Sequence, residues 1–252
     1  YEFLRLNIGV VVGGEGVAIV DTRESHVAAR ELRSDVTHLT DLPIRWVVNT
    51  HHHWDHSFGN AIFDTAEIFG HHRCRARLVD APDESREDAR GWMPAERLGE
   101  IDEVRVTPPG STFEALHSID IGDRMLELRH HGRAHTDNDI VVHAGDVSFM
   151  GDLVEQGSAP VMGDGYPMEW HHTLAATEGE ARSVIVPGHG EPDGRDWLAV
   201  QRDDMAEVAA RLEDVLLRGR ALDDAAASGP FPLPAMREAL VRGIELATTD
   251  AT

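Results

Sequence analysis

The sequence Thr50-His51-His52-His53-Trp54-Asp55-His56 contains the pattern H-x-H-x-D-H directly after a short apolar run, Trp46-Val47-Val48. It places three imidazoles and a carboxylate within six residues. Such groups repel one another when the rings are protonated and are costly to order unless a cation coordinates them. The pattern is internal to the chain and is therefore not a purification tag. It predicts a metal site with two ions, and it indicates that the preceding run is a strand that ends at the site.

Composition limits the classes of function that the site can serve. The chain has 252 residues, a hydrophobic content of 41% and no apolar run long enough to span a bilayer. We expect one soluble α/β domain over residues 1–252. The net charge of −22 argues against nucleic acid or an anionic membrane as the partner. The chain contains no lysine, so a cation that binds a substrate anion must be an arginine, a histidine or the metal.

The order of predicted elements is that of an α/β layer. Two β-rich runs, 8–12 and 17–20, flank a glycine-rich turn and predict a hairpin. Helical spacing over 26–39 and an apolar strand over 44–49 follow, and the strand delivers the histidines. Further elements are then expected in a longer series. They are a strand at 67–70, a helix at 73–79, strands at 118–122, 124–129, 139–143 and 147–150, and a helix at 201–217.

Two segments lie outside this regular pattern. Residues 82–105 are acidic, poor in large aliphatic residues and interrupted by glycine and proline, which predicts a mobile or helical surface insertion. Residues 221–252 form a proline-interrupted C-terminal tail with a short helix. We expect both to belong to the same single domain.

Three more candidate ligands follow predicted strands. His135 lies between two strands, Asp152 follows the apolar run 147–151, and His189 stands between Gly188 and Gly190, which allow the backbone to turn sharply. These positions can supply the second half of a binuclear site.

Together these residues resemble the metallo-β-lactamase-fold hydrolases over about residues 1–215. Asp21, the H-x-H-x-D-H segment, His135, Asp152 and His189 occur in the order of that family's landmarks. The resemblance implies an αββα sandwich with the metal site at one edge. It implies His51, His53 and His135 on one metal, Asp55, His56 and His189 on the other, and Asp152 as the bridge. By the same resemblance Asp21 is a buried structural carboxylate and not a ligand.

The ligand set contains nitrogen and carboxylate but no thiolate, which favours Zn²⁺ and tolerates Fe or Mn. We expect two zinc ions and hydrolysis of an ester, thioester, lactone, amide or phosphoester by the hydroxide that they share. Asp55 is the candidate catalytic residue that holds this hydroxide and passes on its proton.

Several branches of the family fit less well. Some lactamases have a cysteine at the position that Asp152 occupies here, and three residues later they have a lysine that binds the antibiotic's carboxylate. In this chain that later position is Glu155, an acid. Glyoxalase II-like thioesterases bind glutathione with lysine and tyrosine, which are absent or scarce here, and the charge disfavours tRNA nucleases. A mononuclear iron persulfide dioxygenase is a minority alternative because the second-metal ligands are all present. The closest overall likeness is to bacterial hydrolases of this fold, including the quinoprotein-relay type, and this resemblance implies the chemistry without a substrate. A metal-binding scaffold without turnover also remains open.

Pocket candidates are less specific than the ligands. Trp54 can line the cleft or pack beneath the metal loop, and Arg133 can bind a substrate anion or form a surface ion pair. The segment 157–172, with Tyr166 and Trp170, is either a substrate lip or a packed connection with an aromatic anchor. His71, His72, His130 and His131 are not expected to be ligands, since the family positions are already filled.

The expected partner is a small-molecule substrate, with no nucleic acid and no membrane, and self-association into a homo-oligomer stays open. The lone cysteine, Cys74, rules out an intramolecular disulfide and fits the cytoplasm. The chain begins at Tyr1, so trimming and export are also left open.

Overall fold

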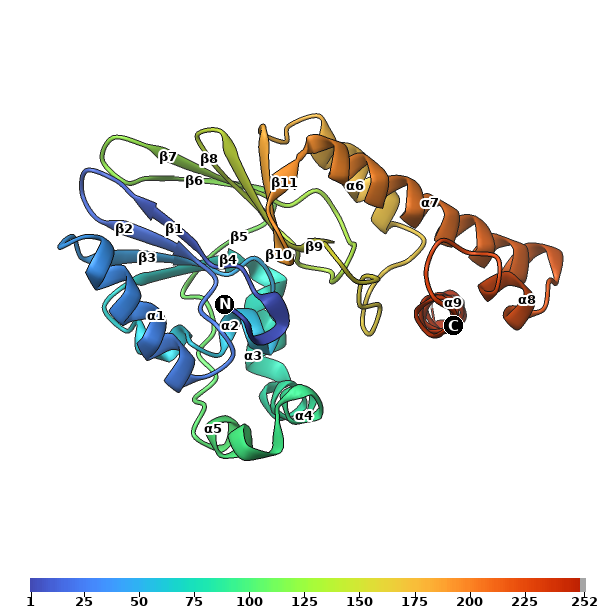
Figure 1. Ribbon diagram of the computed structural model, residues 1–252, viewed down its shortest axis with the longest axis horizontal. Coiled ribbons are helices and arrows are strands. Elements are labelled where there is room, and N and C mark those ends of the chain that lie inside the picture. Colours follow the sequence, from blue (N-terminus) through green and yellow to red (C-terminus); the bar gives the residue numbers. More distant parts are fainter. Residues whose placement is uncertain (250–252) are drawn as a thin grey trace. The chain divides into compact units, whose positions relative to one another are not determined.

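The computed structural model describes residues 1–249 (Figure 1). The chain divides into two compact units, which are described separately below. Unit 1 comprises Tyr1–His130 and Ile140–Gly145. Unit 2 comprises His131–Asp139 and the described chain from Asp146 onward. The interpretation of the whole chain as one domain stays a prediction.

A five-stranded sheet forms the centre of unit 1. Its strands are ordered β1-β2-β3-β4-β5, with β1 and β2 antiparallel and the other neighbours parallel. The bounds are β1 Gly9–Val12, β2 Val17–Val20, β3 Ile44–Val48, β4 Glu67–His71 and β5 Ser111–Phe113. The predicted hairpin is confirmed, and the amide of Gly13 donates to the carbonyl of Gly16 at its turn. Parallel pairing directs the carboxyl ends of β2, β3 and β4 to one edge of the sheet.

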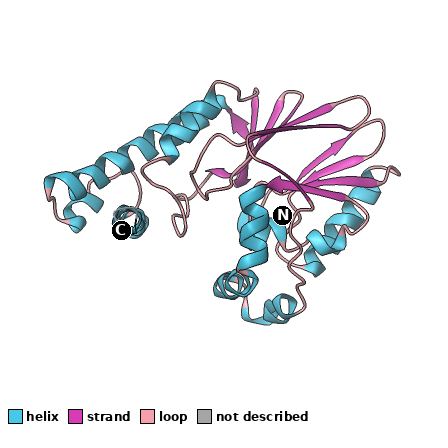
Figure 2. Ribbon diagram, turned by 180° about the vertical axis from the view of Figure 1, so that it is seen from behind, coloured by secondary structure: helices cyan, strands magenta, loops and turns pink. Residues whose placement is uncertain are grey.

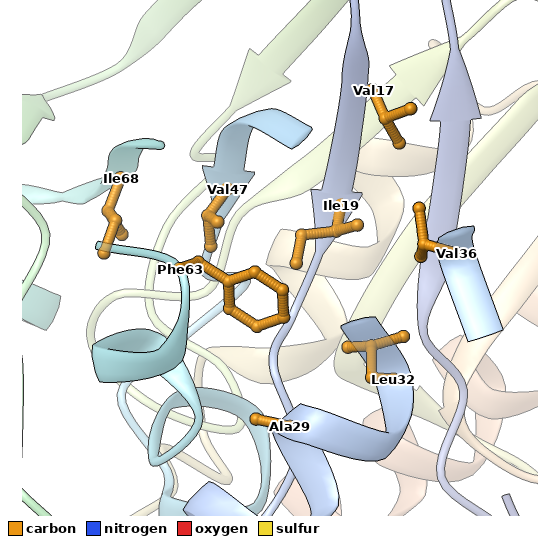
Figure 3. Packing of buried hydrophobic residues seen from close by; sticks show 8 residues of the cluster. All are labelled: Val17, Ile19, Ala29, Leu32, Val36, Val47, Phe63 and Ile68. Atoms are coloured by element: carbon orange, nitrogen blue, oxygen red, sulfur yellow. The ribbon is translucent and has the colours of Figure 1, made fainter. Parts of the chain in front are cut away.

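Helix α1 (His26–Leu39) covers one face of this sheet, over the range that apolar spacing predicts. Its N-terminus is capped by Ser25, whose hydroxyl accepts a hydrogen bond from the amide of Ala28 at 3.1 Å. Its buried face packs against side chains of the central strands (Figure 3). The residues of this core are Val17, Ile19, Ala29, Leu32, Val36, Val47, Phe63 and Ile68.

The segment predicted as a surface insertion is mostly helical. Unit 1 contains η1 Phe3–Arg5, α2 Trp54–Ser57, η2 Asn60–Ile62, α3 His72–Asp80, α4 Pro82–Trp92, η3 Ala95–Arg97 and α5 Leu98–Asp102. Helix α4 begins with a proline at its first position, where the missing amide hydrogen is not needed. Side chains from 82–105 form a second hydrophobic cluster together with Trp54 and Phe58, which lie within and just after the H-x-H-x-D-H segment.

Three antiparallel strands complete unit 1: β6 Leu116–Asp120, β7 Met125–Arg129 and β8 Val141–Ala144. They coincide with predicted strands to within a few residues, because period-two alternation locates a strand better than it locates the strand's ends.

Unit 2 contains β9 Val147–Glu155, α6 Trp170–Glu178, β10 Val184–His189, β11 Asp193–Gly194, α7 Arg195–Arg218, α8 Leu222–Ala226 and α9 Leu233–Thr249. Strand β10 pairs parallel with β9 and antiparallel with β11. Helices α6, α8 and α9 all contact the long helix α7, which is continuous in Figure 2.

Three boundaries in unit 2 differ from the sequence prediction. Strand β9 runs through Asp152 instead of ending before it, and α7 begins six residues earlier than predicted, at Arg195. The C-terminal tail contains two helices, of which α9 has 17 residues and is longer than the short helix expected. Residues 250–252 of the predicted tail lie outside the described residues. Across residues 1–249, no helix combines the length and the apolar character needed to cross a membrane.

Candidate metal centre

The predicted ligands of unit 1 crowd into the loop that follows β3. His51 and His56 are fully buried, Asp55 is 6% exposed and His53 is half-buried. The ring centroid of His51 lies 4.7 Å from that of His53 and 4.3 Å from that of His56. The Nε2 atom of His56 lies 3.5 Å from Oδ2 of Asp55. Sequence adjacency and the short helix α2 therefore bring all four predicted groups of this unit together.

A buried carboxylate orients two of these imidazoles. Asp21 is 2% exposed, and its Oδ2 accepts a hydrogen bond from Nδ1 of His56 at 2.8 Å. The same oxygen accepts from the hydroxyl of Thr50 at 2.8 Å, so that hydroxyl is left to accept from Nδ1 of His51 at 3.1 Å. Each ring thus carries its proton on Nδ1, which makes Nε2 the nitrogen suited to a metal. Asp21 therefore supports two predicted ligands, and it is in none of the residue groups of the described chain that could hold a metal.

Buried amides and a hydroxyl hold the backbone of this loop. The amide of Thr22 donates to the carbonyl of His56 at 2.8 Å, and the hydroxyl of Thr22 donates to Oδ1 of Asn60 at 2.9 Å. Asn49 and Asn60 exchange side-chain hydrogen bonds of 3.0 and 2.7 Å. Sequence reasoning did not identify these residues. Their position directly beside the strand ends was the available signal, but such residues are also common in ordinary turns.

In unit 2 one carboxylate lies between two imidazoles. Oδ2 of Asp152 lies 3.5 Å from Nε2 of His135 and 3.3 Å from Nε2 of His189. The three side chains come from β9, from the end of β10 and from the segment 131–139. Glycine is required beside them, because a Cβ at Gly188 would lie 1.8 Å from Oδ1 of Asp152. The backbone at Gly190 has a φ of +103°, which permits the sharp turn expected after His189.

The ring of His135 is also held from its far side. Its Nδ1 lies 3.2 Å from the carbonyl oxygen of Val161, which can only accept a hydrogen bond. The neighbouring backbone is fixed by Asp139, whose carboxylate accepts from the amide and hydroxyl of Thr136 at 2.7 and 2.8 Å. His135 therefore presents Nε2 toward Asp152, as His51 and His56 present theirs within unit 1.

These donor sets fit a divalent metal. Each unit supplies imidazole and carboxylate groups whose ligand atoms lie within 4.8 Å of one another, for example His51 with His53 and His135 with Asp152. Three of the rings have Nδ1 bound to a protein acceptor, the usual orientation of a metal-ligating histidine. The lone cysteine, Cys74, is buried in α3 and supplies no thiolate to these groups.

The predicted substrate-contacting residues have mixed surroundings. Trp54 is 4% exposed and packs beneath the loop with Phe58, one of the two placements that its sequence position allowed. Trp170 is fully buried, begins α6 and donates from Nε1 to the carbonyl of Leu153 at 3.1 Å. Loop structure in the predicted lip therefore ends at residue 169. Substrate contact by either indole stays a prediction.

Arg133 and Tyr166 contact each other in unit 2. The guanidinium of Arg133 lies 4.6 Å from the ring centroid of Tyr166 and forms two hydrogen bonds, of 2.9 and 2.6 Å, with Glu169. Burial raises the pKa of the half-buried Tyr166 hydroxyl. Arg133 therefore forms an ion pair while remaining partly exposed, and its binding of a substrate anion stays a prediction.

A residue that sequence reasoning missed holds the same loop from α9. The guanidinium of Arg242 donates to the carbonyls of Gly165 and Asp164 at 3.1 and 3.2 Å. It also lies 5.8 Å from the ring centroid of Tyr166. An isolated arginine on an amphipathic helix carries no sequence signal for such a contact.

Other histidines form a separate cluster in unit 1. The ring of His71 stacks on His130 at a centroid distance of 4.1 Å and lies 4.3 Å from His72. Burial, together with the neighbouring His130 and His72, lowers the pKa of His71 to about 3. These rings are not among the residue groups in the described chain that could hold a metal, in agreement with the sequence interpretation.

Comparison with known proteins identifies the family to which this arrangement belongs. The family described as the metallo-beta-lactamase superfamily matches residues 2–189, which include all seven predicted ligands. A metallo-beta-lactamase from Pontibacter korlensis superimposes with a TM-score of 0.65 and 19% identity, covering 78% of this chain and 85% of that one. TMB-1 superimposes with a TM-score of 0.62 and 19% identity, covering 80% and 84%. No curated protein matches the chain. The structural likeness shows the fold, a mixed α/β αββα sandwich of two sheets flanked by helices, which confirms the predicted fold class.

Proposed function

Because this chain belongs to the metallo-β-lactamase superfamily, whose members are mostly hydrolytic metalloenzymes, we propose that it is a zinc-dependent hydrolase with a binuclear centre. His51, His53 and His135 would hold one ion, Asp55, His56 and His189 would hold the other, and Asp152 would be a ligand to both.

The position of Asp152 is the observation that carries this proposal. One of its oxygens lies within 3.5 Å of imidazole nitrogens from two different ligands, which suits a carboxylate shared by two cations. Because His135 carries its proton on Nδ1, its Nε2 directs a lone pair toward this buried oxygen, and a cation between the two would remove their repulsion. The all-nitrogen-and-oxygen donor set favours zinc over metals that select thiolate, and it also accommodates iron or manganese.

When bound, the metal would supply Lewis-acid activation of a water nucleophile and of the bond that is cleaved. The protein's own contribution is orientation and proton transfer. Asp55 is 6% exposed, so it can accept a proton in a site from which bulk water is largely excluded, and return it to the leaving group. Asp21 and Thr50 keep the imidazoles of the loop in one tautomer and so reduce reorganisation during turnover.

The substrate that we propose is a small molecule with an ester, thioester, lactone or amide bond. No lysine is available to bind a substrate anion, and Arg133 is the candidate for that role in unit 2. β-Lactam hydrolysis, the activity named for one structural relative, is a second candidate. It is disfavoured because Glu155 is 4% exposed and binds the backbone of Val161, where lactamases have a lysine for the antibiotic's carboxylate. The lone buried cysteine favours the cytoplasm as the site of action.

The first test combines metal content with turnover. Protein purified without added metal is analysed for zinc, iron and manganese, and is assayed on a panel of esters, thioesters, lactones, amides and β-lactams before and after chelation. Near two zinc ions per chain with chelator-sensitive hydrolysis supports the proposal. One iron per chain with oxygen consumption on a persulfide supports the dioxygenase alternative, and two zinc ions without turnover on the panel supports a scaffold.

The role of Asp55 is tested by Asp55→Ala, with Asp64→Ala as an exposed aspartate control in the same unit. We expect Asp55→Ala to lower kcat by about 100-fold or more, the range of general acid–base catalysis, while the control keeps normal turnover. Wild-type kcat in the folded Asp55→Ala protein would exclude this role.

A further inference from the structure

Glu155 is a buried acid in unit 2 that the proposed chemistry does not use. It is the last residue of β9 and is 4% exposed. Its backbone amide donates to Oε1 of Gln201 in α7 at 3.1 Å, and Nε2 of Gln201 donates to the carbonyl of Leu153 at 2.9 Å. The strand end that carries this carboxylate is therefore attached to the long helix of the unit.

The carboxylate binds the loop between β9 and α6. Oε1 of Glu155 accepts a hydrogen bond from the backbone amide of Val161 at 3.0 Å. A charged acceptor in a buried environment makes a stronger hydrogen bond than a neutral one, so this contact fixes the position of the Val161 peptide.

The carbonyl side of Val161 contacts His135, a predicted metal ligand. The carbonyl of Val161 accepts from Nδ1 of His135 at 3.2 Å, which requires the proton to reside on Nδ1. The Nε2 atom of that ring then faces Asp152 at 3.5 Å with a lone pair available for coordination. Oε1 of Glu155 lies 4.0 Å from Nδ1, too far for a direct hydrogen bond.

We infer that Glu155 is a positioning residue that sets the tautomer and orientation of His135 through the backbone of Val161. The inference rests on the proposed function, because it treats His135 as a metal ligand. It assigns a role to an acid that lies near the site without reaching it as a ligand, and it makes metal affinity depend on the loop 156–169.

The test measures zinc affinity in the full-length, zinc-loaded protein. Zinc transfer to a chromophoric chelator is followed for wild type, Glu155→Ala and Glu155→Gln, and circular dichroism checks that each variant is folded. Glu155→Ala removes the acceptor for Val161, and we expect zinc to bind about tenfold or more weakly, as when other groups that orient a ligand are removed. Wild-type affinity in folded Glu155→Ala would overturn the inference.

Glu155→Gln separates the hydrogen bond from the charge. The amide oxygen of glutamine can accept a hydrogen bond from the amide of Val161. We therefore expect a zinc affinity within about threefold of wild type, a smaller change than the loss seen when a group that orients a ligand is removed. If Glu155→Gln is as weak as Glu155→Ala, the negative charge itself acts on the ring and the inference fails. Because Glu155→Gln keeps the buried acceptor, it also provides the test if Glu155→Ala does not fold.

Glu178→Gln is the matched control. Glu178 lies on α6 in the same unit and pairs with Arg202. Its loss of one negative charge should leave zinc affinity unchanged, and an equal loss in this variant would indicate a general charge effect and contradict the inference. Failure of the proposed function is recognised separately: wild-type protein that binds no zinc would contradict the proposed metal centre, and wild-type protein that binds zinc without turnover would contradict only the proposed catalysis.

Discussion

Asp21 shows how one residue can support several ligands. Its φ is +67°, in the left-handed region that few residues other than glycine adopt, and Arg23 nearby has a φ of +74°. The carboxylate offsets this local strain, since it accepts from the amide and hydroxyl of Thr50 and from Nδ1 of His56. Aspartate is thus needed for its acceptor geometry and not as a metal ligand.

We predict that Asp21→Ala weakens zinc binding by about tenfold to 100-fold, because the rings of His51 and His56 lose their fixed tautomers. The variant also leaves buried donors without an acceptor, which lowers the free energy of unfolding by about 1–3 kcal/mol. Chelator competition and chemical denaturation measure the two effects. Asp35→Ala removes a carboxylate that binds the Tyr1 hydroxyl at the surface, and it should change neither quantity by a comparable amount. Unaltered zinc affinity in Asp21→Ala would contradict the prediction.

At the scale of elements, the helical segment 82–105 supports the loop after β3 that carries the H-x-H-x-D-H pattern in the same unit. Ala89, Met93 and Ile101 from this segment bury Trp54, and Phe58 completes the contact. The indole of Trp54 thus packs between α2 and the helices of residues 82–105. These helices help to hold the loop that carries the predicted ligands of unit 1.

Trp54→Ala should lower the free energy of unfolding by about 3–5 kcal/mol, since it removes a large buried side chain and leaves a cavity. Trp92→Ala is a matched control on α4, because Trp92 is 53% exposed. It should cost well under 1 kcal/mol. Urea denaturation of both variants measures the difference, and equal losses would show that the cluster does not carry this energy.

The junction of β4 and α3 should make unit 1 sensitive to acid. His71 is 1% exposed and has a pKa of about 3, because of burial and the neighbouring His130, His72 and Arg73. Below the ordinary value near 6.5, the unfolded chain binds a proton at this ring that the folded chain does not. The stability contributed by neutral His71 is therefore present above pH 6.5 and is lost as the pH falls toward 3.

His71→Asn tests this sensitivity. Asparagine can still cap α3, where His71 now accepts from the amide of Arg73, but it does not titrate. In metal-free protein, we expect the loss of unfolding free energy between pH 6.5 and 4 to shrink by a few kcal/mol relative to wild type. His38→Asn, at an exposed histidine on α1 of the same unit, should keep the wild-type pH dependence. An identical pH dependence in His71→Asn would contradict the prediction.

Elements with a strong periodic pattern were predictable, and short or uniformly buried ones were not. Helix α1 matches its predicted range because polar and apolar residues alternate at helical spacing and Ser25 caps the first turn. Helix α2 has only four residues, fewer than any periodic pattern needs. Glycine and proline predict a loop up to His172, but α6 begins at Trp170, and this helix gives no periodic signal because its apolar and polar residues do not segregate to two faces.

At the scale of the whole molecule, charge is the dominant property. A net charge of −22 with no lysine implies strong self-repulsion in the compact state, which salt screens. We predict that the free energy of unfolding rises between low and high sodium chloride. Denaturation across a salt series at neutral pH measures this, and the effect should diminish near the isoelectric point, which serves as the control. A fall in stability with salt at neutral pH would show that native ion pairs outweigh the repulsion.

The side chains that gather at the candidate site were predictable from the sequence, and the residues that support them were not. His51, His53, Asp55 and His56 are adjacent in sequence, so local geometry alone brings them together. The surroundings of Asp152 depend on the pairing of β9 with β10 and on the absence of a side chain at Gly188. Contacts such as that between Glu155 and Val161 pass through the backbone, which is the same for every residue type. They leave no pattern in the sequence, and only the folded chain reveals them.

Arg242 has a consequence for how such a protein can diverge over generations. It lies on α9, beyond residue 189 where the family match ends, and it nevertheless holds the carbonyls of Asp164 and Gly165. A lineage that remodelled this last helix would keep every predicted ligand, since all of them lie at or before residue 189, and would still alter the loop that carries Tyr166. Divergence in α9 can therefore change the surroundings of Tyr166 independently of the residues within the family match.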